Sequence, residues 1–175
     1  MELDPLDPFT NLTMGRAQWL AGDLESSLPW MERSISLSPN FAFAIYNSAL
    51  VGTMLGDGDS TQSRIDRAIS LSPIDPLNYA MLATRALTLV VRGDFAAAAK
   101  WADRAIRSPG AHVHIYTIAA VANEIIGESS AAKTHIGTIQ RLQPGYDSSE
   151  FFRAFPFRDG SARAEVEQAL LRLDL

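Results

Sequence analysis

Stretches of about 14 residues that are rich in apolar and small side chains follow one another along the chain, and their composition is that of α-helices. Four glycines, Gly22, Gly56, Gly93 and Gly127, each divide a pair of these stretches. Glycine takes positive φ without a steric penalty, so each of the four marks a point where one helix ends and the chain reverses. No strand pattern is evident. The pattern predicts an all-α protein built from helical hairpins.

Two independent markers indicate that the hairpins are repeats. The four glycines are separated by 34, 37 and 34 residues. A tripeptide that begins with leucine and ends with proline recurs at Leu3, Leu37, Leu71 and Leu142, with steps of 34, 34 and 71 residues. Both markers place a three-residue insertion near Asp75, and such a period is typical of stacked repeats. The predicted units are 8–41, 42–75, 79–112 and 113–146.

The expected starts of the second helices follow from residues with short polar side chains, which accept hydrogen bonds from free backbone N–H groups. We expect Asp59 and Ser130 to be such caps. Pro29 is compatible with a helix if Ser26 is the cap, because the proline then lies in the first turn, where its missing N–H had no partner.

The period and the positions of glycine and proline resemble those of the tetratricopeptide repeat (TPR), whose unit is 34 residues of helix, turn and helix. In that family, unit positions 8, 20 and 27 are small where the two helices cross closely. Eleven of the twelve corresponding residues are small here, and the exception is the last: Gly15, Ser27, Ser34, Ala49, Thr61, Ala68, Ala86, Ala98, Ala105, Ala120, Ala132 and Ile139. The resemblance covers about residues 3–146 and implies a right-handed α-solenoid.

The last part of the chain, residues 147–175, differs from the repeats. Four phenylalanines lie between Phe151 and Phe157, and an amphipathic stretch follows from Ser161 to Leu173. A solenoid needs a cap, because its last repeat otherwise leaves an apolar face in water. We therefore predict that this segment contains a capping helix.

Both ends of the sequence suggest a larger context. The segment Phe155-Pro156-Phe157-Arg158-Asp159 resembles the end of TPR regions at the C-terminus of bacterial adenylate/guanylate cyclase-type signalling proteins and of some winged-helix transcription regulators. Leu3-Asp4-Pro5 reads as the tail of a repeat whose body is missing. The resemblance implies a non-catalytic regulatory module of a larger bacterial signalling protein.

Composition and charge exclude several classes of function. The formal net charge is −5, which is unsuitable for coating nucleic acid. There is no cysteine, no export signal and no apolar run of about 18 residues, so we expect a cytoplasmic protein without disulfides or membrane contact. His112 and His114 are two apart, which on a helix directs them about 200° from each other, so we expect no metal site. No nucleophile, base and orienting group can be assigned, so we expect neither catalysis nor a cofactor.

The resemblance places the first helix of each unit on a concave inner wall, and the residues mapped to that wall are largely apolar. A contiguous apolar surface favours a protein partner, here an apolar helix or an extended peptide. Two alternatives remain: the chain's own tail fills the groove, or the module forms a homodimer through the groove or the Phe151–Phe157 segment. The predicted partner-binding residues are Phe9, Leu12, Arg16, Trp19, Phe43, Tyr46, Leu50, Leu87, Val90, Val121 and Glu124.

Overall fold

The computed structural model describes residues 4–158 and 160–175, and all regular secondary structure in these residues is helical. The predicted all-α fold class is confirmed. Leu3, the first marker of the repeat ladder, lies outside the described residues, as does Asp159. The described helices are α1 (Pro8–Leu20), α2 (Leu24–Leu37), α3 (Ala42–Met54), α4 (Gly58–Leu71), α5 (Asn78–Val91), α6 (Phe95–Ile106), α7 (Val113–Ile125), α8 (Ser129–Leu142), α9 (Ser148–Ala154) and α10 (Ser161–Arg172).

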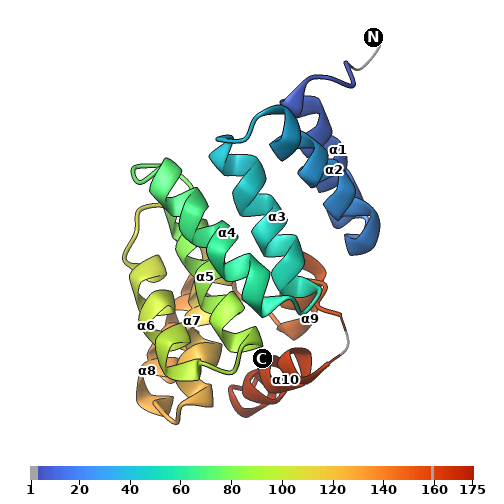
Figure 1. Cartoon of the computed structure of the whole chain (residues 1–175). Helices are drawn as coiled ribbons and strands as arrows, with labels where there is room; N and C mark the ends of the chain where they lie inside the picture. The colour runs from blue at the N-terminus through green and yellow to red at the C-terminus, as the bar shows by residue number, and fades with distance from the viewer. Residues whose placement is uncertain (1–3, 159) are drawn as a thin grey trace.

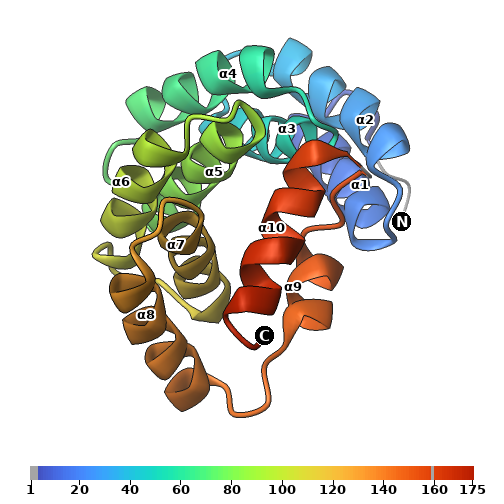
Figure 2. The ribbon, with the colours of Figure 1, turned by 90° about the horizontal axis from the view of Figure 1, so that it is seen from below.

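The first eight helices form four antiparallel hairpins that stack side by side into a curved solenoid (Figure 1). Seen from below, α1, α3, α5 and α7 form the inner layer, and α2, α4, α6 and α8 form the outer layer (Figure 2). All four predicted turn glycines have φ between +76° and +90°, so the reversal in each hairpin uses the left-handed conformation that glycine allows.

Aspartate side chains cap α1, α2, α4, α6 and α9, but not always at the predicted positions. Asp57 is the cap of α4 and accepts the backbone N–H of Ser60 at 3.1 Å, so the prediction of Asp59 was wrong by two residues. The cap of α2 is Asp23 rather than Ser26, which places Pro29 inside the helix. Glu128 rather than Ser130 precedes α8 and makes no side-chain capping bond. The glycine at each turn is followed directly by an acidic residue, and in the first three turns this residue is an aspartate that caps the next helix.

The small residues at the helix crossings are buried in all four units, as the resemblance implies. In the first unit the hydroxyl of Ser27 donates to the carbonyl oxygen of Gly15 at 2.8 Å, and that of Ser34 donates to the carbonyl of Pro8 at 2.6 Å. In the second unit Gly52 lies against Thr61, where a Cβ on Gly52 would meet the threonine methyl group at 2.5 Å. Glycine on α3 thus leaves room for the larger residue on α4.

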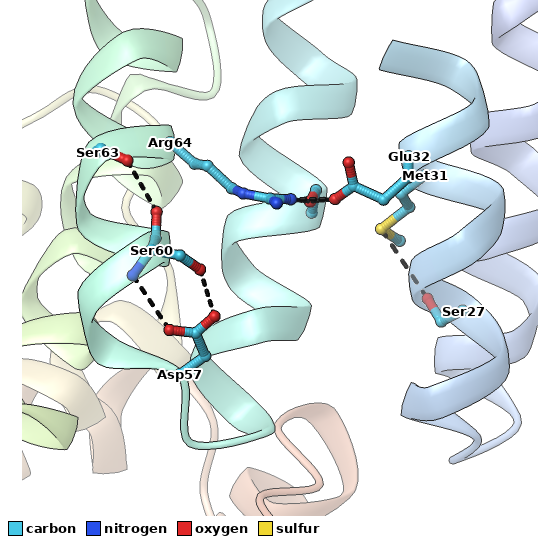
Figure 3. A network of polar contacts seen from close by, with 8 residues as sticks. Ser27, Met31, Glu32, Asp57, Ser60, Ser63 and Arg64 are labelled. Carbon is cyan, nitrogen blue, oxygen red and sulfur yellow. Dashed lines mark hydrogen bonds and ion pairs between the residues drawn. The ribbon is translucent and has the colours of Figure 1, made fainter. Parts of the chain in front are cut away.

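Polar contacts join the first two hairpins across their outer helices. The guanidinium of Arg64 on α4 reaches over α3 to the carboxylate of Glu32 on α2, with which it forms an ion pair (Figure 3). Ser48 on α3 lies between them and donates to Glu32 at 2.9 Å. The first two units therefore contact each other through buried apolar surface and through side chains that bridge three helices.

The C-terminal helix α10 buries its apolar face against α5 and α7, which are inner helices. Val166, Ala169, Leu170 and Leu173 are at most 6% exposed, as the amphipathic pattern predicts. Figure 2 shows α9 and α10 in the middle of the ring of hairpins, inside its curve. The segment predicted as a cap thus covers part of the concave face, as in the alternative in which the chain's own tail occupies the groove.

Candidate functional site

The concave face is divided into a covered part and an open part. Of the eleven predicted binding residues, Leu12, Leu50, Leu87, Val90 and Val121 are at most 3% exposed, and Tyr46 is 8% exposed. Leu12, Val90 and Val121 are therefore not available to a partner, whereas Tyr46, Leu50 and Leu87 line the pocket described below. Phe9 is 59% exposed, whereas Arg16, Trp19, Phe43 and Glu124 are half-buried.

Polar contacts near both ends of α10 connect the tail to the hairpins. The backbone N–H of Arg158 donates to the carbonyl of Met54 at the end of α3, at 2.9 Å. The Arg158 side chain forms an ion pair with Glu25 on α2. At the other end Arg172 Nε lies 3.2 Å from Glu124 Oε1 on α7. Glu124, predicted to contact a partner, therefore binds the chain's own last helix.

A pocket of about 230 Å³ remains between the inner layer and the tail. Its walls come from four inner helices and from the end of α9, which contributes Ala154 and Phe155. The small side chains of Ala80 and Ala83 on α5 leave space that larger residues would fill. The other lining residues are Trp19, Leu20, Tyr46, Leu50, Thr84, Leu87, His112, His114, Ile115 and Ile118.

The polar groups of the pocket are uncharged at neutral pH. Burial raises the pKa of Tyr46 to about 12, and its hydroxyl is hydrogen-bonded to Thr84, so the phenol stays protonated. His114 Nδ1 lies 2.8 Å from the hydroxyl of Tyr146. Burial lowers the pKa of His114 below its ordinary value of 6.5, and the neighbouring His112 lowers it further. The pocket therefore favours apolar or neutral groups.

The role of the two histidines is not evident from the sequence. They were expected to point apart, but His112 is the N-cap of α7 with extended backbone (φ −122°, ψ −177°) and does not follow helical geometry. Its ring and that of His114 meet edge to face, with centroids 5.5 Å apart. His114 also contacts Phe155 of the tail with a centroid distance of 5.7 Å, so aromatic rings connect α7 to the tail.

We expect acid to destabilise the chain through His114. Its pKa is lower in the folded chain than in the unfolded chain, so the unfolded chain binds more protons at mildly acidic pH. This contribution is intact above about pH 6.5 and is lost as the pH falls below that value. The groups that face the imidazole are His112, Glu150 and Arg153, and Glu150 alone opposes the shift. Urea titrations from pH 7 to pH 5 are expected to show a decreasing free energy of unfolding.

The control for this prediction is His114→Gln, which keeps a neutral polar side chain. In this variant the decrease between pH 6.5 and 5 is expected to be smaller than in the wild type, because one titrating group is gone. The remaining dependence of the free energy of unfolding on pH is assigned in part to His135, because burial lowers the pKa of that side chain as well. Equal slopes in both proteins would show that His114 makes no contribution.

The open part of the concave face lies on α1 and the start of α3. Phe9, Arg16 and Leu20 are spaced along one side of α1, and Leu20 is 76% exposed. The guanidinium of Arg16 lies 5.8 Å from the ring centre of Trp19 and 5.1 Å from that of Phe43, so cation–π contacts join the two helices. Arg16 also donates to Asn47 Oδ1 at 3.2 Å. Among the described residues, no carboxylate forms an ion pair with Arg16.

No family model matches the chain, and no curated protein matches its sequence. Solved structures do resemble it. A double mutant of MamA from RS-1 aligns with a TM-score of 0.65 at 16% identity, over 83% of this chain and 80% of MamA. YrrB, described as a TPR protein with an unusual peptide-binding site, aligns with a TM-score of 0.60 at 16% identity, over 97% of this chain and 84% of YrrB. MamA from AMB-1 aligns with a TM-score of 0.61 at 18% identity, over 83% and 85% of the two chains.

These likenesses define the class of the fold, which is that of a TPR α-solenoid. Within the part of the chain that the structure describes, no helix has the length and apolar character needed to cross a bilayer.

Proposed function

We propose that this chain is a non-catalytic scaffold that binds a helix or peptide of another protein. The observation that carries the proposal is the strip formed by Phe9, Trp19, Leu20 and Phe43 beside Arg16, in which Trp19 and Leu20 also line the pocket next to the tail. Two of its members, Phe9 and Leu20, expose more than half of their surface. Large exposed apolar side chains that cluster on one face are typical of interaction sites, where aromatic residues and arginine contribute most of the binding energy.

The shape of the solenoid supports the same reading. The strip lies on the inner layer, and the stacked hairpins fix its curvature because each unit packs on its neighbours. A partner that buries this surface gains about 25 cal/mol per Å² before the costs of ordering are subtracted. The proposed site is smaller than the sequence suggested, because α9 and α10 occupy the rest of the concave face.

We further propose that the scaffold works within a larger signalling protein. The support is the resemblance of the segment around Phe155 and Arg158 to the ends of TPR regions in bacterial cyclase-type proteins and winged-helix regulators. The homodimer alternative receives less support, because Phe151 and Phe157 are at most 5% exposed and pack inside the chain. The reading frame around the chain in its genome, together with light scattering at several protein concentrations, separates these possibilities.

The binding proposal is tested by selecting random peptides on the immobilised chain and by measuring the selected peptides against variants. Trp19→Ala and Phe43→Ala are each expected to weaken binding at least about tenfold, since each removes one of the three aromatic side chains of the strip. The matched control is Leu142→Ala on the outer helix α8, where a 53% exposed leucine is removed far from the strip, and binding is expected to be unchanged. Peptides that bind all of these variants equally would contradict the proposal.

A further inference from the structure

The pocket beneath the tail is built from both ends of the described chain. Trp19 and Leu20 come from α1, whereas Ala154 and Phe155 come from the end of α9. The inner helices alone do not complete it, because Phe155 forms one wall and is itself held by His114 and by Phe151, whose ring centre is 5.0 Å away. The docked tail therefore completes the pocket.

The size of the pocket suits one side chain rather than the face of a helix. Apolar cavities of about 150 Å³ admit a benzene molecule, so a volume of about 230 Å³ has room for one aromatic group with one or two rings. The lining is mainly carbon, and aromatic walls from Trp19, Tyr46 and Phe155 favour edge-to-face or offset contact with another ring. A charged group would lose its hydration there without gaining an opposite charge.

The edge of the pocket carries a positive charge, that of Arg16. Arg16 contacts the ring of Trp19, which is a wall of the pocket, and acts electrostatically on Tyr46, another wall. Its guanidinium offers five donors and, among the described residues, forms hydrogen bonds with Asn47 alone. Two half-buried aromatic rings hold it in place, so a carboxylate that arrives beside the pocket meets a preorganised partner.

We propose that the pocket between the inner helices and Phe155 is an anchor site for one aromatic side chain of a bound peptide, and that Arg16 binds the carboxylate of an acidic residue next to it. This inference rests on the proposed function and specifies its ligand. It commits to a peptide because two lining residues of the pocket, Trp19 and Leu20, also belong to the exposed strip, along which a chain can lie while one side chain enters the pocket. The tail then serves as a wall of the binding site, not as a competitor for it.

The test uses the full chain and an array of capped octapeptides. Each peptide carries a central Trp, Phe, Leu or Ala with Glu, Gln or Lys beside it. The wild type is expected to bind peptides with Trp or Phe next to Glu at least about tenfold more tightly than those with Ala or with Lys. A uniform response across the array would overturn the proposal, even if peptides selected at random still depend on Trp19.

Three variants separate the parts of the site. Ala80→Leu fills the pocket from a half-exposed position and is expected to remove the aromatic preference. Phe155→Ala removes the wall that the tail contributes and is expected to weaken the binding of aromatic peptides about tenfold. Arg16→Gln is expected to abolish the preference for Glu over Gln while the aromatic preference remains. Thermal denaturation checks that each variant is folded, and an unchanged array profile for any of the three would overturn its part of the site.

Matched controls are available on outer helices. Ala97→Leu enlarges a half-buried alanine on α6, and Arg33→Gln removes an exposed arginine on α2. Both are expected to give the wild-type profile. Free indole-3-acetate is measured alongside, because it carries an aromatic ring and a carboxylate without a peptide. If it binds as tightly as the best octapeptide, the site belongs to small aromatic acids and the assignment to a peptide is wrong.

Discussion

Phe151→Ala is expected to lower the free energy of unfolding by about 3–5 kcal/mol, because it empties the space of a fully buried aromatic side chain. Phe151 is 0% exposed and contacts the rings of Phe152 and Phe155. It is the main apolar attachment of α9, a helix of seven residues that does not form alone in water. Urea denaturation followed by circular dichroism measures the loss.

The neighbouring residue provides the control. Phe152 is half-buried, and its ring lies 4.3 Å from the guanidinium carbon of Arg163. Phe152→Ala is therefore expected to cost about 1–2 kcal/mol, less than the change at Phe151. Hydrogen exchange of the amides in α10 is expected to rise in the Phe151 variant, because the tail loses its attachment. Equal losses at the two positions would show that Phe151 is not the anchor.

Gly15→Ala is expected to destabilise the chain by about 1–3 kcal/mol, although alanine is normally the better helix former. A Cβ at this position would lie 2.8 Å from Cγ of Met31 and 3.0 Å from the backbone oxygen of Ser27. The methionine can adjust, but the carbonyl belongs to α2, so the two helices must separate. The hydrogen bond from Ser27 to Gly15 lengthens at the same time.

Gly137→Ala on α8 is the opposite case. There the nearest atom to a new Cβ is Nη1 of Arg141 at 3.9 Å, so nothing has to move. This variant is expected to gain about 0.5–1 kcal/mol from the higher helix propensity of alanine. Thermal or urea unfolding of both variants gives the comparison. A loss at Gly137 or a gain at Gly15 would contradict the packing that the structure shows.

The repeats were predictable because their signals are local. Gly22 and Gly127 indicate turns because glycine allows the left-handed backbone conformation, and Ala98 and Ala120 indicate helix crossings because they are small. Each of these residues can therefore be interpreted without knowing its distant neighbours. The caps were less predictable. Several acidic and hydroxyl residues follow each turn, and the choice of Asp57 over Asp59 depends on where the turn ends rather than on residue type.

The position of the tail could not be read from the sequence. The amphipathic pattern that ends in Leu170 and Leu173 shows that α10 buries one face. Two apolar surfaces could receive that face, namely the concave wall of the solenoid and the end of the last repeat, and the sequence does not distinguish them. The choice is made by contacts between distant residues, such as Arg158 with Glu25 and Arg172 with Glu124. The groove prediction therefore included side chains that the tail covers.

The pairing of Arg158 with Glu25 joins residues 133 positions apart, and this changes the mechanics of the whole molecule. An open solenoid extends like a spring and can lose its terminal units one at a time, since each is held only by its neighbour. Here the C-terminal segment, which follows the last hairpin, crosses the inside of the curve and contacts the first hairpin through Arg158. Fraying of the first hairpin must therefore break a contact with the C-terminal segment as well as the packing on its neighbour, so the two ends of the coil are coupled directly.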